Sequence, residues 1–199
     1  MSNSTGAFGL QPIGMDNGSS WNGAVEKVYI SAAYGAALYI GTPVIISPTT
    51  AEKEATGRYQ TVNIAVATGG VYYGVIVSFE PNPDNLGLLY SPTLTEGYAY
   101  IVKDADVVFR VRGDGSGAPI ANYIGANAAM VATTAGSTYT GLSGWHLDET
   151  TPAETVTFPL RILGIEDKED NDLSDNAIYR VKLNTTGLAA GDRLGELGA

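Results

Sequence analysis

The chain has 199 residues and a formal net charge of −10, with 44% hydrophobic residues, 16% charged residues and no cysteine. The acidic balance argues against contact with nucleic-acid phosphates and gives no support for binding an anionic membrane, and the lack of cysteine excludes disulfides and thiolate chemistry. The length suits one large β domain or two small ones. Charged residues make up ~25% of usual soluble domains, so the low charge predicts that much of this surface contacts other protein; a monomer with a neutral surface is the alternative.

The N-terminal segment combines few charges with many aromatic, Gly, Asn and Ser residues. Across the first fifty residues only Asp16, Glu26 and Lys27 are charged. So few charges are not typical of a solvated disordered tail, and the Gly and Pro residues interrupt helices. We therefore expect residues 1–28 to form an extended arm that lies on a surface, and residues 29–199 to form a β-rich body. The predicted contact residues of the arm and the start of the body are aromatic or apolar: Phe8, Leu10, Pro12, Ile13, Trp21 and Tyr29.

Period-two patterns follow in the first half of the body. Residues 62–66 and 73–79 alternate on either side of Thr68-Gly69-Gly70, which predicts a β-hairpin. Further short strands are expected at 29–30, 38–40 and 44–46. Dense turn residues separate these segments and leave no room for long helices.

Two strands in the second half have one apolar and one basic side. Residues 107–112 alternate so that Val107, Phe109 and Val111 share a face, which predicts a half-buried strand with a basic outer edge. Residues 178–183 repeat the pattern. Another strand is expected at 160–165, and one or two helical turns are expected at 119–123.

Many short strands with little helix predict a mainly β fold, either a β-barrel or a sandwich of short antiparallel strands, behind an extended N-terminal arm. The body forms one unit or splits into two small β subdomains near residue 115. From Thr185 onward the chain is small and Gly-rich, and we expect it to be loosely held unless a neighbour orders it.

No catalytic constellation stands out. His146 is the single histidine, and the sequence Gly141-Leu142-Ser143-Gly144 near it fails the G-x-S-x-G elbow because the second Gly falls one position early. We expect His146 to be a loop histidine near Trp145, and the chain not to be an enzyme. Gly113, Gly115 and Gly117 do not have the spacing of a phosphate-binding loop, because Ala118 stands where the last Gly is required and no P-loop Lys is present, so they predict a turn.

The remaining motifs also have simple structural readings. Arg112-Gly113-Asp114 matches a cell-adhesion tripeptide, but Gly and Asp are common at strand ends. The acidic run 167–175 offers oxygen ligands for a cation such as Ca²⁺. It departs from the EF-hand loop, however: when the loop is counted from Asp170, Asp175 stands at the sixth position in place of Gly. We expect a solvated connection there, no metal site and no cofactor.

The order of several short motifs resembles a family of tailed-bacteriophage virion proteins. These proteins begin with an FGxxP arm, followed by xNG and xYxGDPV. The corresponding segments here are 7–12, 21–23 and 38–44, with Thr42 in place of the Asp. The likeness continues through most of the chain, in segments 74–77, 99–109, 124–128, 136–138, 141–143 and 159–164.

The resemblance implies a capsid decoration, or cement, protein. Such a protein would bind the major capsid protein on the outer surface of the capsid and stabilise the shell by bridging its subunits. The centre of the chain also resembles, more loosely, lambda-type decoration proteins, which are trimeric β-tulips on three-fold sites; a homotrimer is therefore expected. Because the N-terminus lacks a secretion signal, the chain is expected to be made in the host cytoplasm and then to join the virion.

Two other virion roles remain open at this stage. The twelve Tyr and two Trp residues could form sugar-stacking platforms in a receptor- or glycan-binding head fibre or tail protein. Fibres usually show repeats or coiled coils, and neither is found here. A head–tail connector or minor tail protein is the remaining alternative, and copy number per particle distinguishes it from a decoration protein.

Overall fold

The computed structural model describes residues 3, 5–67, 70–117, 123–153 and 157–184. These residues form twelve short strands, and every pair of neighbouring strands is antiparallel. The strands are β1 (Gln11–Met15), β2 (Glu26–Ile30), β3 (Pro43–Ile46), β4 (Val62–Ile64), β5 (Gly74–Phe79), β6 (Gly97–Val102), β7 (Val107–Arg112), β8 (Asn127–Ala128), β9 (Met130–Gly136), β10 (Ser143–Leu147), β11 (Leu160–Ile165) and β12 (Ile178–Leu183).

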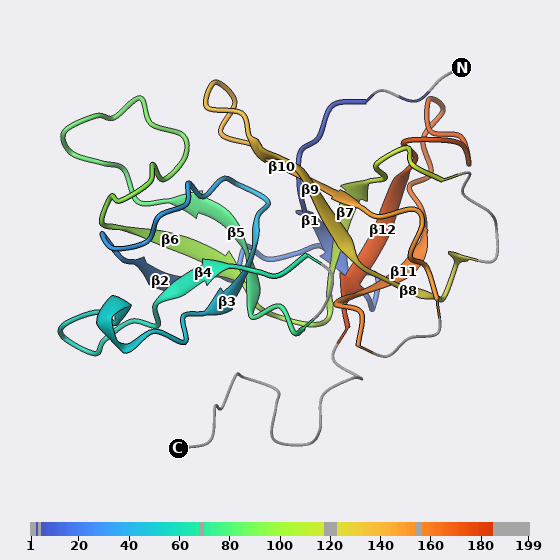
Figure 1. The fold of residues 1–199 in the computed structure, drawn as a ribbon. Coiled ribbons are helices and arrows are strands. Elements are labelled where there is room, and N and C mark those ends of the chain that lie inside the picture. The colour runs from blue at the N-terminus through green and yellow to red at the C-terminus, as the bar shows by residue number, and fades with distance from the viewer. Residues whose placement is uncertain (1–2, 4, 68–69, 118–122, 154–156, 185–199) are drawn as a thin grey trace.

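The strands make two five-stranded sheets and one hairpin. One sheet has the order β2-β6-β5-β3-β4, the other has the order β1-β7-β12-β11-β8, and β9 pairs with β10. Figure 1 shows the two sheets side by side, with the hairpin tip projecting at the top of the view. The predicted mainly β class is confirmed. The sheets are open in the described part of the chain, so they fit a sandwich-like arrangement and do not close into a barrel.

The two sheets share one hydrophobic core. Phe109, Ile162 and Val181 of the second sheet belong to the same buried cluster as Val75 and Val102 of the first. A smaller cluster, which includes Val28, Val44, Ile76 and Ile101, covers the other face of the first sheet. This follows from the pleat, because Val75 and Ile76 are adjacent in β5 and point to opposite faces. Buried packing is therefore continuous between the two sheets.

The predicted hairpin of residues 62–66 and 73–79 is wrong. Both segments are strands, but β3 lies between β4 and β5 and pairs with each of them. The connection crosses β3, with Ala65 N–H donating to Pro43 O at 2.9 Å and Tyr73 N–H donating to Val44 O at 2.8 Å. The alternation of apolar residues fixes which face of a strand is buried, but it carries no information on which strand is the neighbour.

The expected division into arm and body differs from the structure. Residues 11–15 are extended as predicted, but they form β1 and pair with β7 of the chain's own sheet. The boundary at residue 28 falls inside β2. The chain passes between the two sheets twice, from β1 to β2 and again from β6 to β7 at 103–106.

Strands β7, β11 and β12 match their predicted positions, and β12 pairs with both β7 and β11. Segment 38–40 makes only isolated bridges, through Leu38 and Ile40. The helical turns expected at 119–123 fall almost wholly outside the described residues, as does the tail from Thr185. The described residues include a 3-10 turn at Thr50–Glu52, and Tyr123 also has 3-10 geometry; no described helix is long and apolar enough to cross a membrane.

Candidate interaction surface

Three segments that are far apart in the sequence meet beside the two sheets: the residues before β1, the residues before β3, and the start of β10. The Leu10 N–H donates to Gly41 O at 2.9 Å, and the Thr42 hydroxyl donates to Ser143 Oγ at 3.2 Å. Gly9 and Gly41 have φ angles of 69° and 87°, in the left-handed region that favours glycine. A Cβ on Gly9 would lie 2.5 Å from Gly41 O, so a side chain cannot fit without movement of the backbone. We call Gly9, Leu10, Gly41, Thr42 and Ser143 the joint.

The segments that carry the family resemblance meet at this joint. Segment 7–12 contributes Gly9 and Leu10, and segment 38–44 contributes Gly41 and Thr42. Segment 141–143 completes the contact, since Ile40 N–H donates to Gly141 O and Ser143 N–H donates to Ile40 O, both at 2.8 Å. These motifs therefore mark a structural contact within one chain.

Phe8 covers the outer face of β7, which was expected to be a basic, solvent-facing edge. Its ring centroid lies 5.4 Å from Arg110 Cζ and 5.5 Å from Arg112 Cζ, within cation–π range. Gln11 Oε1 accepts hydrogen bonds from Arg110 Nε at 3.0 Å and Nη2 at 2.8 Å. The N-terminal segment thus partly covers this strand, and Arg112 is buried.

Most of the predicted contact residues are used by the chain itself. Leu10 is 1% exposed and belongs to the shared core, and Tyr29 is buried with its ring edge against Tyr98. Trp21 packs partly buried against the same core. Phe8 and Pro12 are half-buried. Ile13 is the one of the six whose side chain is exposed, at 40%.

The most exposed apolar side chains lie instead on two loops that the sequence reasoning left out. Leu86 is 77% exposed and Leu94 is 65% exposed, both between β5 and β6, and Tyr139 at the β9–β10 turn is 90% exposed. Leu94 has a φ of 54°, which is strained for a residue with a Cβ. The two loops touch, since a Cβ on Gly141 would meet the backbone and Cβ of Leu89. A leucine-rich run inside the Pro- and Asn-rich segment 81–95 was the available sequence signal.

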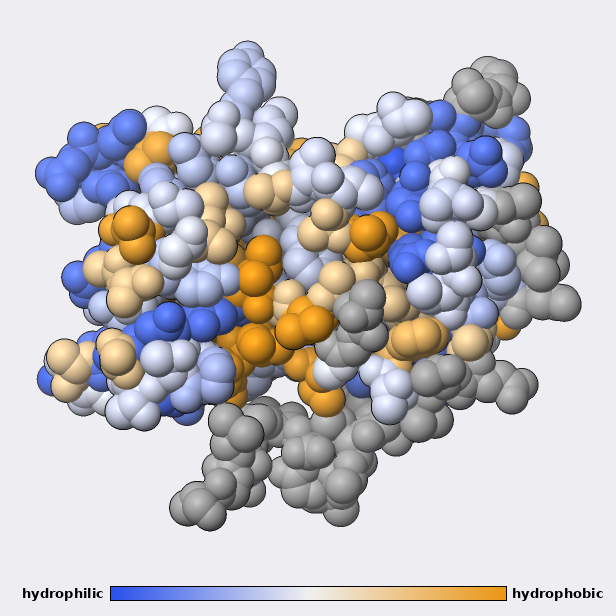
Figure 2. All heavy atoms as spheres, viewed as in Figure 1, coloured by the Kyte–Doolittle hydropathy of each residue, from blue (hydrophilic) through white to orange (hydrophobic). Residues whose placement is uncertain are grey.

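A second apolar area lies between the two sheets. Figure 2 shows a band of hydrophobic residues between the halves of the molecule on this face. The β4–β5 connection lies at this boundary in Figure 1, and its Val66 and Val71 are exposed. Exposed apolar patches of this kind are typical of surfaces that contact other molecules.

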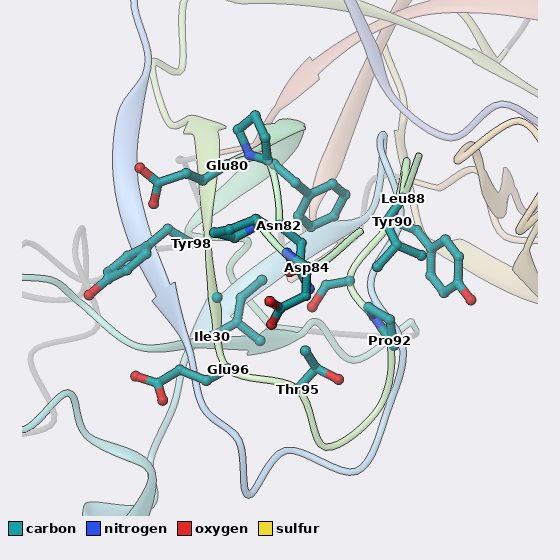
Figure 3. Close-up of a pocket in the computed structure, with 15 residues that line it drawn as sticks. Ile30, Glu80, Asn82, Asp84, Leu88, Tyr90, Pro92, Thr95, Glu96 and Tyr98 are labelled. Atoms are coloured by element: carbon teal, nitrogen blue, oxygen red, sulfur yellow. Dashed lines mark hydrogen bonds between the residues drawn. The ribbon is translucent and has the colours of Figure 1, made fainter. Parts of the chain in front are cut away.

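A pocket of about 570 Å³ lies under the β5–β6 loop, with Pro, Tyr and acidic residues in its lining. Glu80, Asp84 and Glu96 supply its carboxylates, and Figure 3 shows that the Glu80 and Glu96 side chains extend away from Asp84. Lys27 donates to Glu80 at 2.9 Å and lies 4.1 Å from the centroid of the Tyr98 ring. The carboxylates do not converge, so the pocket lacks the paired acids of a glycosidase.

Ser143 and His146 do not form a nucleophile–base pair. Ser143 Oγ accepts from Thr42 and from the Trp145 N–H, and His146 Nδ1 lies 3.0 Å from Thr133 Oγ1. Burial lowers the pKa of His146. His146 lies in β10 rather than in the expected loop, and its hydrogen bond to Thr133 links the two strands of the hairpin.

The acidic run at 167–175 is organised by two asparagine side chains. Asn3 Nδ2 donates to the carbonyls of Asp172 at 3.0 Å and Asp175 at 3.1 Å, and Asn171 Nδ2 donates to Glu166 O at 2.7 Å. These hydrogen bonds tie the backbone of the acidic run to the N-terminal segment and to the end of β11. Within the described residues no three His, Asp or Glu side chains are placed to hold a metal ion.

Glu149 is fully buried and organises the loop that follows β7. It accepts hydrogen bonds from the Tyr179 hydroxyl at 2.9 Å and from the Gly115 N–H at 2.7 Å. A Cβ on Gly113 would collide with the Glu149 carboxylate, so Gly113 is fixed by packing. The Arg112-Gly113-Asp114 tripeptide therefore belongs to a buried hydrogen-bonded loop, with Arg112 only 8% exposed, and this excludes its presentation as an adhesion motif.

Glu149 predicts a pH dependence of stability. Burial raises the pKa of the Glu149 carboxyl above its ordinary value, while the Tyr179 hydrogen bond opposes that rise in pKa. Between the ordinary carboxyl pKa of ~4.3 and the raised one, the folded chain binds more protons than the unfolded chain. The free energy of unfolding should therefore fall as pH rises through this window. Urea unfolding at a series of pH values should show this slope in the natural chain and not in Glu149→Gln.

Tyr179→Phe provides the matched test, because it keeps the ring and removes the hydrogen bond that stabilises the charged carboxylate. The pH range over which the free energy of unfolding falls should then extend to higher pH. A natural chain and Glu149→Gln with identical pH profiles would contradict this assignment.

Comparison with protein-family models, with curated proteins and with solved structures finds no match to this chain.

Proposed function

We propose that the chain is a capsid decoration protein, which binds the outer surface of a tailed-phage shell and stabilises it by bridging major capsid subunits. In this proposal it acts through surface contacts, as a homotrimer, without a cofactor and without contact to nucleic acid or membrane. The proposal rests on the family resemblance of the sequence and on the kind of surface that the fold presents.

The observation that carries the proposal is the contact among segments 7–12, 38–44 and 141–143. Each motif alone is short, and a chance likeness would scatter over unrelated parts of a fold. Here the three segments touch, and two of them need glycine at the point of contact, Gly9 and Gly41. Such mutual dependence supports reading the motifs together as the signature of one fold.

The surface also favours a protein that works by contact. Leu86 and Leu94 are large apolar side chains on a projecting loop, and Leu94 is held there by a strained backbone. Strain of this kind persists where the surrounding structure enforces it, often at binding sites. We assign this loop, together with Ile13, to contact with the shell in place of the deeper arm residues.

The glycan-binding alternative draws on the pocket under the β5–β6 loop, but its aromatic rings are partly occupied. Tyr90 stacks on Tyr39 with centroids 5.1 Å apart, and Tyr98 has Lys27 over its face. A sugar platform needs an open ring face, so the pocket favours this alternative only weakly.

Binding of purified chain to heads assembled without it tests the proposal. The double variant Leu86→Asp with Leu94→Asp is expected to reduce occupancy strongly, because two charges would be buried at the contact. Leu173→Asp, at another exposed leucine outside this loop, is the matched control and should bind like the natural chain. Equal occupancy for all three would contradict the assignment of this loop.

A further inference from the structure

The connection between β1 and β2 contains both Asn–Gly pairs of the chain, Asn17-Gly18 and Asn22-Gly23. All four residues are exposed, so water reaches each pair. In such a pair the backbone nitrogen of the glycine can attack the side-chain amide of the asparagine, because glycine has no Cβ to obstruct the approach. No atom lies within 4 Å of a Cβ added to either glycine, so crowding by the rest of the fold does not distinguish the two pairs.

The two glycine N–H groups differ in their hydrogen bonding. Gly18 N–H donates to Met15 O at 3.0 Å, and Met15 N–H donates to Ser19 O at 2.9 Å, so the first pair is held in a closed turn at the end of β1. Gly23 N–H donates no hydrogen bond to any residue that the structure describes. To attack, a glycine nitrogen must lose its proton and turn toward the asparagine side chain. Gly18 must first break a hydrogen bond, and Gly23 need not.

Both asparagine side chains accept hydrogen bonds at the oxygen atom that becomes negative during the attack. Asn22 Oδ1 accepts from Ala24 N–H at 3.0 Å. Asn17 Oδ1 accepts from Ser19 N–H at 2.9 Å and from Ser19 Oγ at 2.7 Å. Donors placed at a developing negative charge stabilise it, so these hydrogen bonds favour reaction at both sites. The feature that favours Asn22 is therefore the unbonded Gly23 nitrogen, in contrast to the closed turn around Gly18.

We propose that Asn22 is a site of spontaneous deamidation in the folded chain and that the turn around Gly18 protects Asn17. The Gly23 nitrogen forms a bond to Cγ of Asn22, and the bond from Cγ to the side-chain nitrogen breaks. The proton of the Gly23 N–H passes through water to the leaving group, which departs as ammonia and leaves a succinimide ring. Water then opens the ring at either carbonyl, which gives aspartate or isoaspartate at position 22. Nothing is oxidised or reduced.

The modification would change an exposed connection between the two sheets. The chain passes from β1 to β2 through residues 16–25, and Trp21, next to Asn22, packs against the shared core. Deamidation adds a negative charge beside Trp21, and isoaspartate also lengthens the main chain by one carbon. Because residues 22–24 are exposed, we expect the fold to remain while the charge and the path of this connection change. The inference goes beyond the proposed function and does not depend on it.

Peptide mapping by mass spectrometry tests the inference on the natural chain, kept folded at mildly alkaline pH. Deamidation at Asn22 should be about fivefold faster than at Asn17, the rate ratio that corresponds to one typical hydrogen bond. The product at position 22 should include isoaspartate, because direct hydrolysis of the amide by water gives aspartate alone. The same chain unfolded in urea is the matched control. Without the turn, the two pairs should react at similar rates, since each is followed by a small residue, Ser19 or Ala24.

A substitution at the attacking residue checks the route. Gly23→Ala places a methyl group beside the nitrogen and should lower the rate at Asn22 while the rate at Asn17 stays unchanged; thermal unfolding checks that the variant folds. Equal rates at the two sites of the folded chain, faster reaction at Asn17, or a rate ratio that unfolding leaves unchanged would overturn the proposal. Aspartate without isoaspartate at position 22 would overturn it as well. None of these results bears on the copy number on particles, and hence on the proposed function.

Discussion

Alanine at Gly41 is expected to destabilise the fold by about 3 kcal/mol, which combines the cost of a left-handed alanine with that of overpacking. Gly41 has a φ of 87°, and its Cβ would lie 2.6 Å from Phe8 O and 3.0 Å from Gly9 Cα. The new methyl group would push the N-terminal segment away from the first sheet. The free energy of unfolding in urea measures the loss.

Gly23→Ala is the matched control for this substitution. Gly23 has a similar φ of 79°, but no atom lies within 4 Å of its added Cβ. It should therefore cost only the backbone strain, about 1 kcal/mol. Equal losses at the two positions would show that the close approach of Gly9 and Gly41 does not hold the halves together.

Leu10→Ala is expected to cost about 2–5 kcal/mol, the range for removing a buried leucine from a core. Leu10 is 1% exposed and packs in the cluster that both sheets share. Leu86→Ala removes the same atoms from a side chain that is 77% exposed, and should change stability by no more than about 0.5 kcal/mol. Thermal or urea unfolding of the two variants compares them directly.

A small effect of Leu10→Ala on stability would instead support the separable N-terminal arm that the sequence predicts. With the effect expected here, deletion of residues 1–28 would remove β1, Leu10 and part of β2. Such a deletion would unfold the chain and could not report on binding. Single substitutions at exposed positions are therefore the informative way to test contact with a shell.

The sequence was sufficient to predict the positions of strands that have an apolar face and a basic or polar face. β7 and β12 alternate apolar with basic or polar residues, and both lie where the alternation predicts them. The sequence was insufficient to predict strand order. The patterns of β4 and β5 are equally consistent with a hairpin and with two strands that both neighbour β3. That choice depends on the shared core, which involves residues from both ends of the chain.

The candidate surface was harder to predict, since its features depend on long-range contact. The apolar residues of the N-terminal segment looked available for a partner because their own core partners are far away in sequence: Leu10 contacts Gly41, and Phe8 contacts Arg110 and Arg112. The basic side of β7 looked solvated for the same reason.

The abundance of this chain on purified virus particles tests the central proposal most directly. Quantitative mass spectrometry of intact particles compares it, copy for copy, with the major shell subunit. A decoration protein should be present in numbers comparable with the shell subunit and should copurify with heads separated from tails. Particles that lack the chain, or that carry only the few copies of a ring at the neck, would contradict the account.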